Sequence, residues 1–113
     1  TYLDLARRLA LPTLVVAANR LGTLNHCALT ARVARAEGLL VRGLVFSQTT
    51  PAMDVSAASN PGLIPALTGL PLLAVLPHAD PRTAAAYIPI DYFFPNCLDS
   101  TGRSEVRTLR AEK

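Results

Sequence analysis

Hydrophobic residues alternate between two kinds of spacing along the first eighty positions of the chain. Three blocks are rich in apolar residues, and the first of them, at residues 13–18, is a continuous apolar run with β-branched residues, which is typical of a strand buried on both faces of a parallel sheet. These blocks cover residues 13–18, 39–47 and 71–76. The segments around them carry helical spacing or helix-capping residues, and they predict helices over residues 2–10, 24–37 and 62–68. A polar, proline-containing loop over residues 48–61 precedes the last helix.

This alternation of helices and strands predicts right-handed crossovers and a parallel sheet. The expected fold class is α/β, with a three-layer doubly wound parallel sheet. Ligands of such sheets bind beyond the carboxyl ends of the strands, so residues 19–25, 47–51 and 77–80 should lie on one rim. Three parallel strands leave two open edges and cover too little surface. We therefore expect the second half of a domain, completed by a missing N-terminal half or by a companion chain.

The composition is that of a folded chain. Half of the 113 residues are apolar and 17% are charged, which excludes a disordered chain and fits one domain. The net charge is +3, and most of the basic excess comes from the tail, at Arg103, Arg107, Arg110 and Lys113. A solvated terminal segment explains this charge better than a nucleic-acid-binding surface. We expect an α/β unit over residues 1–80 and an irregular, weakly ordered tail over residues 81–113.

The two cysteines, Cys27 and Cys97, are far apart and fit no metal-ligand spacing, which indicates reduced structural thiols and a cytoplasmic protein. No apolar run reaches the roughly 18 residues that a membrane span requires, and no signal-peptide pattern is present. We expect no metal site within this chain, and neither a nucleic acid nor a membrane as its partner.

The segment from Asn19 to His26 joins the first strand to a helix through a tight turn that contains Gly22. The first amides of that helix, near Leu24, Asn25 and His26, are expected to lack intrahelical acceptors. Free amides and the helix dipole favour a bound carboxylate or phosphate, but every strand-turn-helix unit has such an end, so an ordinary helix start is the alternative. No nucleophile motif accompanies His26, so we expect no general-base role for it and assign no catalytic residue.

The run from Asn19 to His26 reads Asn-Arg-Leu-Gly-Thr-Leu-Asn-His, and its Leu-Gly-x-x-Asn-His core resembles the C-terminal part of dethiobiotin synthase. The similarity extends from Tyr2 to Asp80 and includes an Asp-Leu-Ala helix, a Leu-Pro-Thr-Leu-Val-Val strand and an Asn-Pro loop. The enzymes of that family are homodimeric P-loop ligases that close a cyclic urea on 7,8-diaminononanoate, using carbon dioxide, ATP and magnesium. The resemblance implies a P-loop NTPase-like fold, a homodimer and a place in biotin biosynthesis.

The resemblance also implies two sets of binding residues. In the family, the start of one helix receives the substrate carboxylate across the dimer interface. The residues that match this helix start are Gly22, Thr23, Leu24 and Asn25. The nucleotide base is expected beside Ser47, Gln48, Pro77, His78 and Ala79. Ser47 stands where the family usually has an adenine-binding Asn and offers one hydroxyl in place of an amide, so the neighbouring Gln48 is the alternative contact.

Phosphate and magnesium binding in such enzymes needs the motif Gly-x-x-x-x-Gly-Lys-Ser/Thr. The sequence lacks this motif, and its only lysine is Lys113. ATP and Mg²⁺ are therefore expected to bind mainly to the missing N-terminal half, and the chain alone should be inactive. Two alternatives stay open. One is a synthetase domain of the cobyrinate-amidation type, against which the Leu-Gly-x-x-Asn-His run argues; the other is a non-catalytic nucleotide-fold remnant that binds a partner or a small anion.

Overall fold

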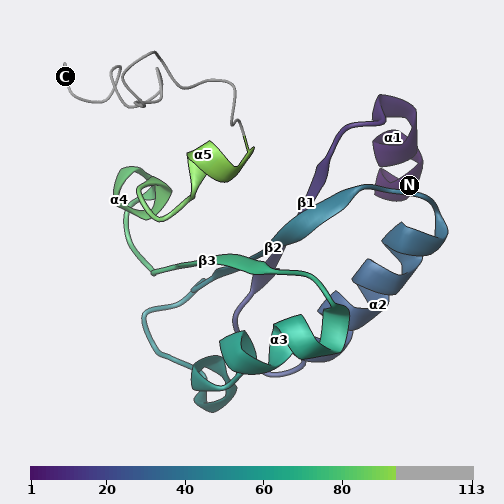
Figure 1. Ribbon diagram of the computed structural model, residues 1–113. Helices are drawn as coiled ribbons and strands as arrows, with labels where there is room; N and C mark the ends of the chain where they lie inside the picture. Colours follow the sequence, from purple (N-terminus) through teal and green to yellow (C-terminus); the bar gives the residue numbers. More distant parts are fainter. Residues whose placement is uncertain (94–113) are drawn as a thin grey trace, which may run out of the picture.

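A parallel sheet of three strands lies at the centre of the computed structural model, which describes residues 1–93 (Figure 1). The strands follow the order β1-β2-β3 and comprise β1 (Thr13–Ala18), β2 (Val41–Ser47) and β3 (Leu72–Leu76). All three predicted strands are confirmed, with small differences in their starts. The third begins after Pro71, which has no amide to donate, but the Pro71 carbonyl still accepts the Leu44 amide at 2.9 Å.

The three predicted helices are present, with ends that differ by one or two residues from the prediction. They are α1 (Tyr2–Leu9), α2 (Thr23–Ala36) and α3 (Asn60–Thr68), with a short 3-10 helix, η1 (Val55–Ala58), inside the predicted loop. The capping box expected at the start of α1 is present, because the Thr1 hydroxyl accepts the Asp4 amide at 3.2 Å and donates to the Asp4 carboxylate at 2.6 Å. The third helix ends at Gly69, whose φ of 66° suits a left-handed C-terminal residue.

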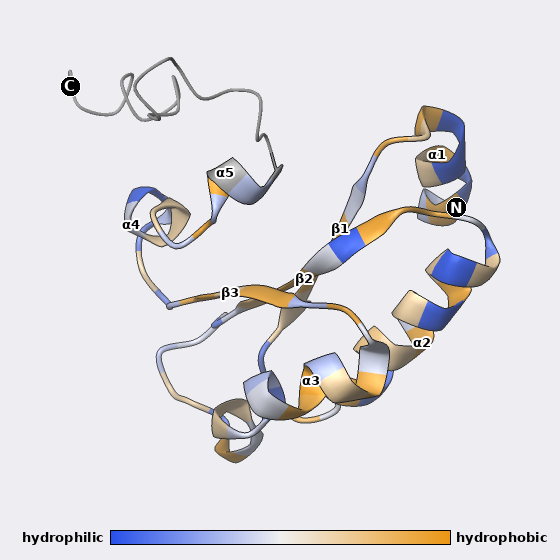
Figure 2. Cartoon of the chain, viewed as in Figure 1, coloured by the Kyte–Doolittle hydropathy of each residue, from blue (hydrophilic) through white to orange (hydrophobic). Residues whose placement is uncertain are grey.

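The hydrophobic core lies between the sheet and one layer made by α2 and α3, which lie on the same side of the sheet (Figure 1). Its buried members are Cys27, Ala31, Leu44, Phe46, Ile64 and Leu70. Figure 2 shows hydrophobic residues along β3 and much of β2, and mixed hydrophilic and hydrophobic residues along α2. Of the three strands, only β2 contains fully buried residues, which agrees with helices that cover the sheet on one face. The α/β fold class is thus confirmed.

One of the two edges of the sheet is formed by β1, which pairs only with β2 among the described residues. Val16 on this strand is 64% exposed. Beside the edge runs an apolar groove of ≈ 710 Å³, whose walls include Tyr2 of α1 and Leu29 and Val33 of α2. An edge strand with exposed β-branched residues and an adjoining apolar groove is unusual for a surface that faces only water.

Two short helices follow β3, in the first part of the segment that was predicted to be irregular. The helix α4 (Pro81–Ala85) begins with Asp80, whose carboxylate accepts the Arg82 amide at 2.9 Å, and with a proline at its first position. In α5 (Ile90–Phe93), the Tyr92 hydroxyl donates to the Arg42 carbonyl at 3.2 Å. The basic cluster of the tail and Cys97 lie outside the described residues. None of the helices within residues 1–93 is long and apolar enough to span a membrane.

Candidate functional site

The carboxyl ends of the three strands meet at one rim. The last paired residues are Ala18 with Ser47, and Ser47 with Leu76. One residue further along, the Asn19 amide donates to the Ser47 carbonyl and the Gln48 amide donates to the Leu76 carbonyl, both at 2.9 Å. The turn after β1, the Ser47–Gln48 step and Pro77 therefore share this rim, as the sequence predicted.

The turn into α2 depends on Gly22, which is the N-cap residue and has a φ of 88°. Glycine adopts this left-handed conformation without the penalty that a Cβ atom brings. No side chain caps the helix. The amide of Thr23 donates to the Arg20 carbonyl at 3.2 Å, which closes the turn.

The unpaired amides at this end belong to Leu24 and Asn25, for which residues 1–93 provide no acceptor. The His26 amide is different, because it donates to the Gly22 carbonyl at 3.3 Å. The expectation of a free amide at His26 was wrong for a geometric reason. The carbonyl of the N-cap residue accepts the first intrahelical bond, so the amide four positions later is already paired.

Side chains around this helix start divide into buried and exposed groups. Thr23 is buried, and its hydroxyl lies 3.8 Å from the Cys27 sulfur. Asn25 and His26 are exposed. His26 and Arg20 line a hollow of ≈ 290 Å³ between α2 and the β1 edge. The positive charge of Arg20, a few positions before the two free amides, makes a favourable environment for an anion.

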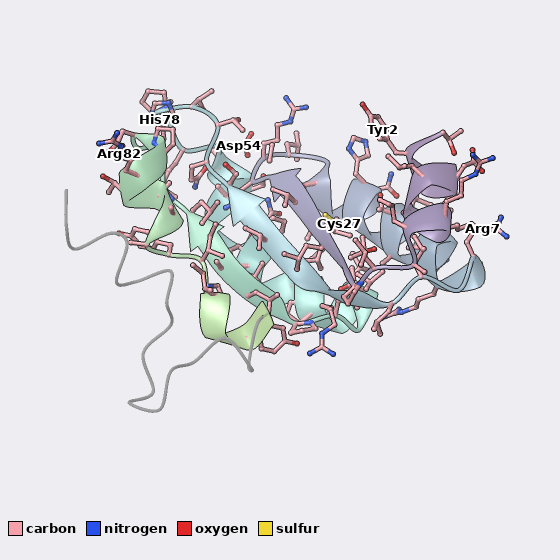
Figure 3. All side chains as sticks on the ribbon, turned by 90° about the horizontal axis from the view of Figure 1, so that it is seen from above. Tyr2, Arg7, Cys27, Asp54, His78 and Arg82 are labelled. Carbon is pink, nitrogen blue, oxygen red and sulfur yellow. The ribbon has the colours of Figure 1, made fainter. Side chains whose placement is uncertain are left out.

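The residues predicted to contact a nucleotide base follow β2 and β3. Ser47, Gln48 and Pro77 are half-buried, whereas His78 and Ala79 are exposed. Figure 3 shows His78 in the loop after β3, on the opposite side of the view from Arg7 of α1. The side chains of Ser47, Gln48 and His78 form no hydrogen bond with any other residue in the described part of the chain. Their polar atoms are thus available to a ligand at this rim.

Sequence reasoning missed two polar groups that support the turn. Asp54 accepts hydrogen bonds from the Ser56 hydroxyl at 2.5 Å and from the Ser56 amide at 2.8 Å. The Ser56 hydroxyl, followed by the backbone amides of Ser56 and Leu21, holds the pKa of Asp54 below its ordinary value. A carboxylate from the long loop therefore lies beside the Arg20–Leu21 step. Figure 3 labels Asp54 in this region.

The second missed group is a pair of buried amides, Asn19 and Asn60, which are 4% and 2% exposed. Asn60 Nδ2 donates to Asn19 Oδ1 at 2.9 Å. Asparagine directly after a strand was a visible signal, but its partner is 41 positions away in the sequence, so the pairing itself could not be predicted.

Residues 1–86, which include the whole sheet and the rim, match the model of a family described as AAA domain. The chain belongs to this family. Within residues 1–93 of this family member, no group of three or more His, Cys, Asp or Glu side chains is placed to hold a metal ion.

Several curated relatives of this AAA-domain chain share one name. The chain is 47% identical over 77 residues to an ATP-dependent dethiobiotin synthetase BioD of Anaeromyxobacter sp. (strain K), and this match covers 68% of the chain and 34% of that protein. It is 42% identical over 87 residues to the protein of that name from Saccharopolyspora erythraea, covering 77% and 39%, respectively. The chain is 38% identical over 71 residues to the protein of that name from Bacillus subtilis (strain 168), and this match covers 63% of the chain and 31% of that protein.

These similarities confirm the resemblance to dethiobiotin synthase. They also confirm the P-loop NTPase-like α/β arrangement, since the family model covers all three strands and both core helices. The chain spans about a third of the length of the curated relatives it matches.

Proposed function

We propose that this chain supplies the substrate-carboxylate end and part of the adenine pocket of an ATP-dependent dethiobiotin synthetase, acting in biotin biosynthesis. Such an enzyme closes a cyclic urea on 7,8-diaminononanoate with carbon dioxide and ATP. One observation carries the proposal: the free amides of Leu24 and Asn25 lie on the same rim as Ser47 and Pro77. Ligands of parallel α/β sheets bind beyond the carboxyl ends of the strands, so this rim is where a carboxylate and a nucleotide base are expected to bind.

The carboxylate end is proposed to form at the start of α2, with Gly22, Thr23, Leu24 and Asn25. The left-handed backbone conformation of Gly22 leads the chain into the helix, and the next amides without an acceptor within the described residues are those of Leu24 and Asn25. The helix has 14 residues, and its dipole places partial positive charge at these amides. Binding the carboxylate at this remote end would fix the position of the reacting amines, which is how binding energy contributes to ring closure.

The adenine end is proposed to form where β2 and β3 terminate, at Ser47, Gln48, Pro77, His78 and Ala79. Adenine presents both a donor and acceptors along its edge. A serine hydroxyl satisfies one of these at a time, whereas a Gln side chain offers a carbonyl and an amino group together. We therefore propose that Gln48 provides the second hydrogen bond to the base.

The remaining parts of the reaction need groups that this sequence lacks. The triphosphate and Mg²⁺ require a phosphate-binding loop, and we propose that the rest of the ligase, homologous to the other two-thirds of the relatives, provides it. That part is either continuous with this polypeptide or a companion chain. The exposed Val16 edge and its ≈ 710 Å³ apolar groove support an additional strand and helix at this position.

The assembly proposed here is a cytoplasmic homodimer in which the start of α2 receives the diamine bound to the partner subunit. Exposure of Asn25 and His26 supports this arrangement, since both side chains are open to a second molecule. The buried thiol of Cys27 is compatible with a reducing compartment.

A segment exchange tests the proposal. Residues 1–86 of this chain would replace the matching segment of the Anaeromyxobacter sp. (strain K) synthetase, and dethiobiotin formation from 7,8-diaminononanoate, bicarbonate and ATP would be followed by mass spectrometry. We expect turnover, with a KM for the diamine that rises in the Asn25→Ala chimera while the KM for ATP is unchanged. The unmodified relative and an Ala36→Ser chimera, altered at the exposed far end of α2, serve as controls. A folded chimera that binds ATP but never turns over the diamine would contradict the proposal.

A further inference from the structure

Two buried asparagine side chains connect the turn after β1 to the start of α3. Asn19 Nδ2 donates to the Ala57 carbonyl at 3.0 Å, and Asn60 Nδ2 donates to Asn19 Oδ1 at 2.9 Å and to the Arg20 carbonyl at 3.2 Å. The two side chains are almost completely buried. Water therefore cannot replace these hydrogen bonds without opening the structure.

The orientation of both amides follows from their partners. The carbonyl of Ala57 only accepts hydrogen bonds, so the amino group of Asn19 must face it and Asn19 Oδ1 must face Asn60. Asn60 must then present its amino group, and the Arg20 carbonyl, also an acceptor, requires the same orientation. Two independent backbone carbonyls thus give one consistent arrangement of donors and acceptors.

The Arg20 carbonyl is the position at which this pair acts on the turn. It accepts hydrogen bonds from Asn60 Nδ2 and from the Thr23 amide, both at 3.2 Å. No side chain caps α2 at Gly22. Asn60, which belongs to α3, therefore stabilises the turn that leads into α2. An N-cap side chain of α2 would otherwise have this stabilising role.

We infer that Asn60, oriented by Asn19, is a positioning residue for the carboxylate site at the start of α2. The inference rests on the proposed function, because that function places a carboxylate at the amides of Leu24 and Asn25. These two amides point in a direction set by the turn from Arg20 to Gly22, and Asn60 fixes the first carbonyl of that turn. Asn60 is too deeply buried to contact the ligand and acts through the backbone.

The experiment uses the full 113-residue chain, labelled with ¹⁵N and titrated with 7,8-diaminononanoate. A second titration uses 2,3-diaminooctane, which has the same diamine but no carboxylate. The variants are Asn60→Ala and Asn60→Ser. Serine suits a helix start and is too short to span from α3 to Asn19. The matched control is Thr68→Val, which removes a buried hydroxyl from the other end of α3, where it bonds the Ile64 carbonyl and the Leu70 amide.

We expect the unaltered chain and Thr68→Val to show shifts of the Leu24 and Asn25 amides with the carboxylate-bearing diamine only. In both Asn60 variants the Kd for 7,8-diaminononanoate should rise about tenfold, because the amides of Leu24 and Asn25 are no longer held in the orientation that binds the carboxylate. Hydrogen exchange at the Thr23 amide should accelerate in both, because its acceptor is no longer fixed. This second readout is measured without ligand, and Asn60→Ser keeps the test decisive where Asn60→Ala does not fold.

The two hypotheses fail in different ways. If the unaltered chain binds the carboxylate but a folded Asn60→Ser binds it equally and keeps slow exchange at Thr23, the positioning role is wrong and the proposed function stands. If the unaltered chain responds equally to both diamines, the carboxylate site itself is wrong, and the role of Asn60 in positioning it is overturned with it.

Discussion

The backbone amide of Asn19 donates to the carbonyl of Ser47 at 2.9 Å, one residue beyond the last paired positions of β1 and β2. This bond extends the parallel ladder into the rim. The helix start proposed for the carboxylate and the loop proposed for the adenine are consequently attached to adjacent, hydrogen-bonded strands. Sites supported by rigid elements keep their geometry better than sites built on loops alone. Because the two ends follow different strands and are proposed to bind different ligands, a substitution at one end should affect only the ligand of that end.

The turn into α2 should tolerate no residue with a Cβ atom at Gly22 without loss of stability. A Cβ atom there would meet no atom within 4 Å, so the cost of Gly22→Ala comes only from its φ of +88°. We expect the free energy of unfolding to fall by about 1 kcal/mol in urea denaturation. Gly62→Ala is the matched control, since its Cβ is equally unobstructed but the position lies inside α3 with an ordinary φ. It should stabilise slightly. Equal destabilisation of both variants would contradict the explanation.

Asp54 should make the stability of the chain depend on pH in the acid range. Hydrogen bonds from Ser56 and Leu21 lower its pKa in the folded state below the ordinary value of 3.8. The folded chain therefore keeps this carboxylate charged where the unfolded chain is already protonated. Its stabilising contribution is complete above that ordinary value and is lost as the pH falls through the lowered folded pKa.

Two variants test this sign. Asp54→Asn should lower the free energy of unfolding at neutral pH, and the difference from the unaltered chain should shrink on acidification. Ser56→Ala removes the largest cause, so the pKa of Asp54, measured by NMR of the side-chain carboxyl, should move up toward its ordinary value. An unchanged titration of Asp54 in Ser56→Ala would show that the Ser56 hydroxyl is not responsible.

The sequence was sufficient for the sheet because apolar runs with β-branched residues favour strands, and parallel order follows from the helices between them. The shared rim follows from the same order. The hydrogen bonds at the start of α2 were predicted less well, because the amide of His26 is paired with the Gly22 carbonyl. The contact between Asn19 and Asn60 could not be found, because it depends on how α3 packs against the end of β1, and neither residue carries a local signal for the other.

The backbone amide of Asn25, rather than its side chain, should dominate carboxylate binding. Proline is tolerated in the first turn of a helix and has no amide to donate. In the chimeric synthetase, Asn25→Pro should therefore raise the KM for 7,8-diaminononanoate more than Asn25→Ala does, and neither should change the KM for ATP. The comparison would count against the site if alanine and proline had equal effects. Circular dichroism of each variant checks that α2 is retained.

The adenine end offers a prediction in which affinity is gained. Ser47 is half-buried at the end of β2, and its side chain makes no hydrogen bond within the described residues. An amide at this position can donate to and accept from the adenine edge at once, whereas the hydroxyl satisfies one group at a time. In the chimeric synthetase, Ser47→Asn should lower the KM for ATP several-fold, on the order of one hydrogen bond or about 1 kcal/mol, and leave the KM for the diamine unchanged. Thr49→Asn, two positions further along and exposed, is the control and should change neither value. If Ser47→Asn left ATP binding unchanged while Gln48→Ala weakened it, Gln48 would already supply the contact that an asparagine at position 47 is expected to make.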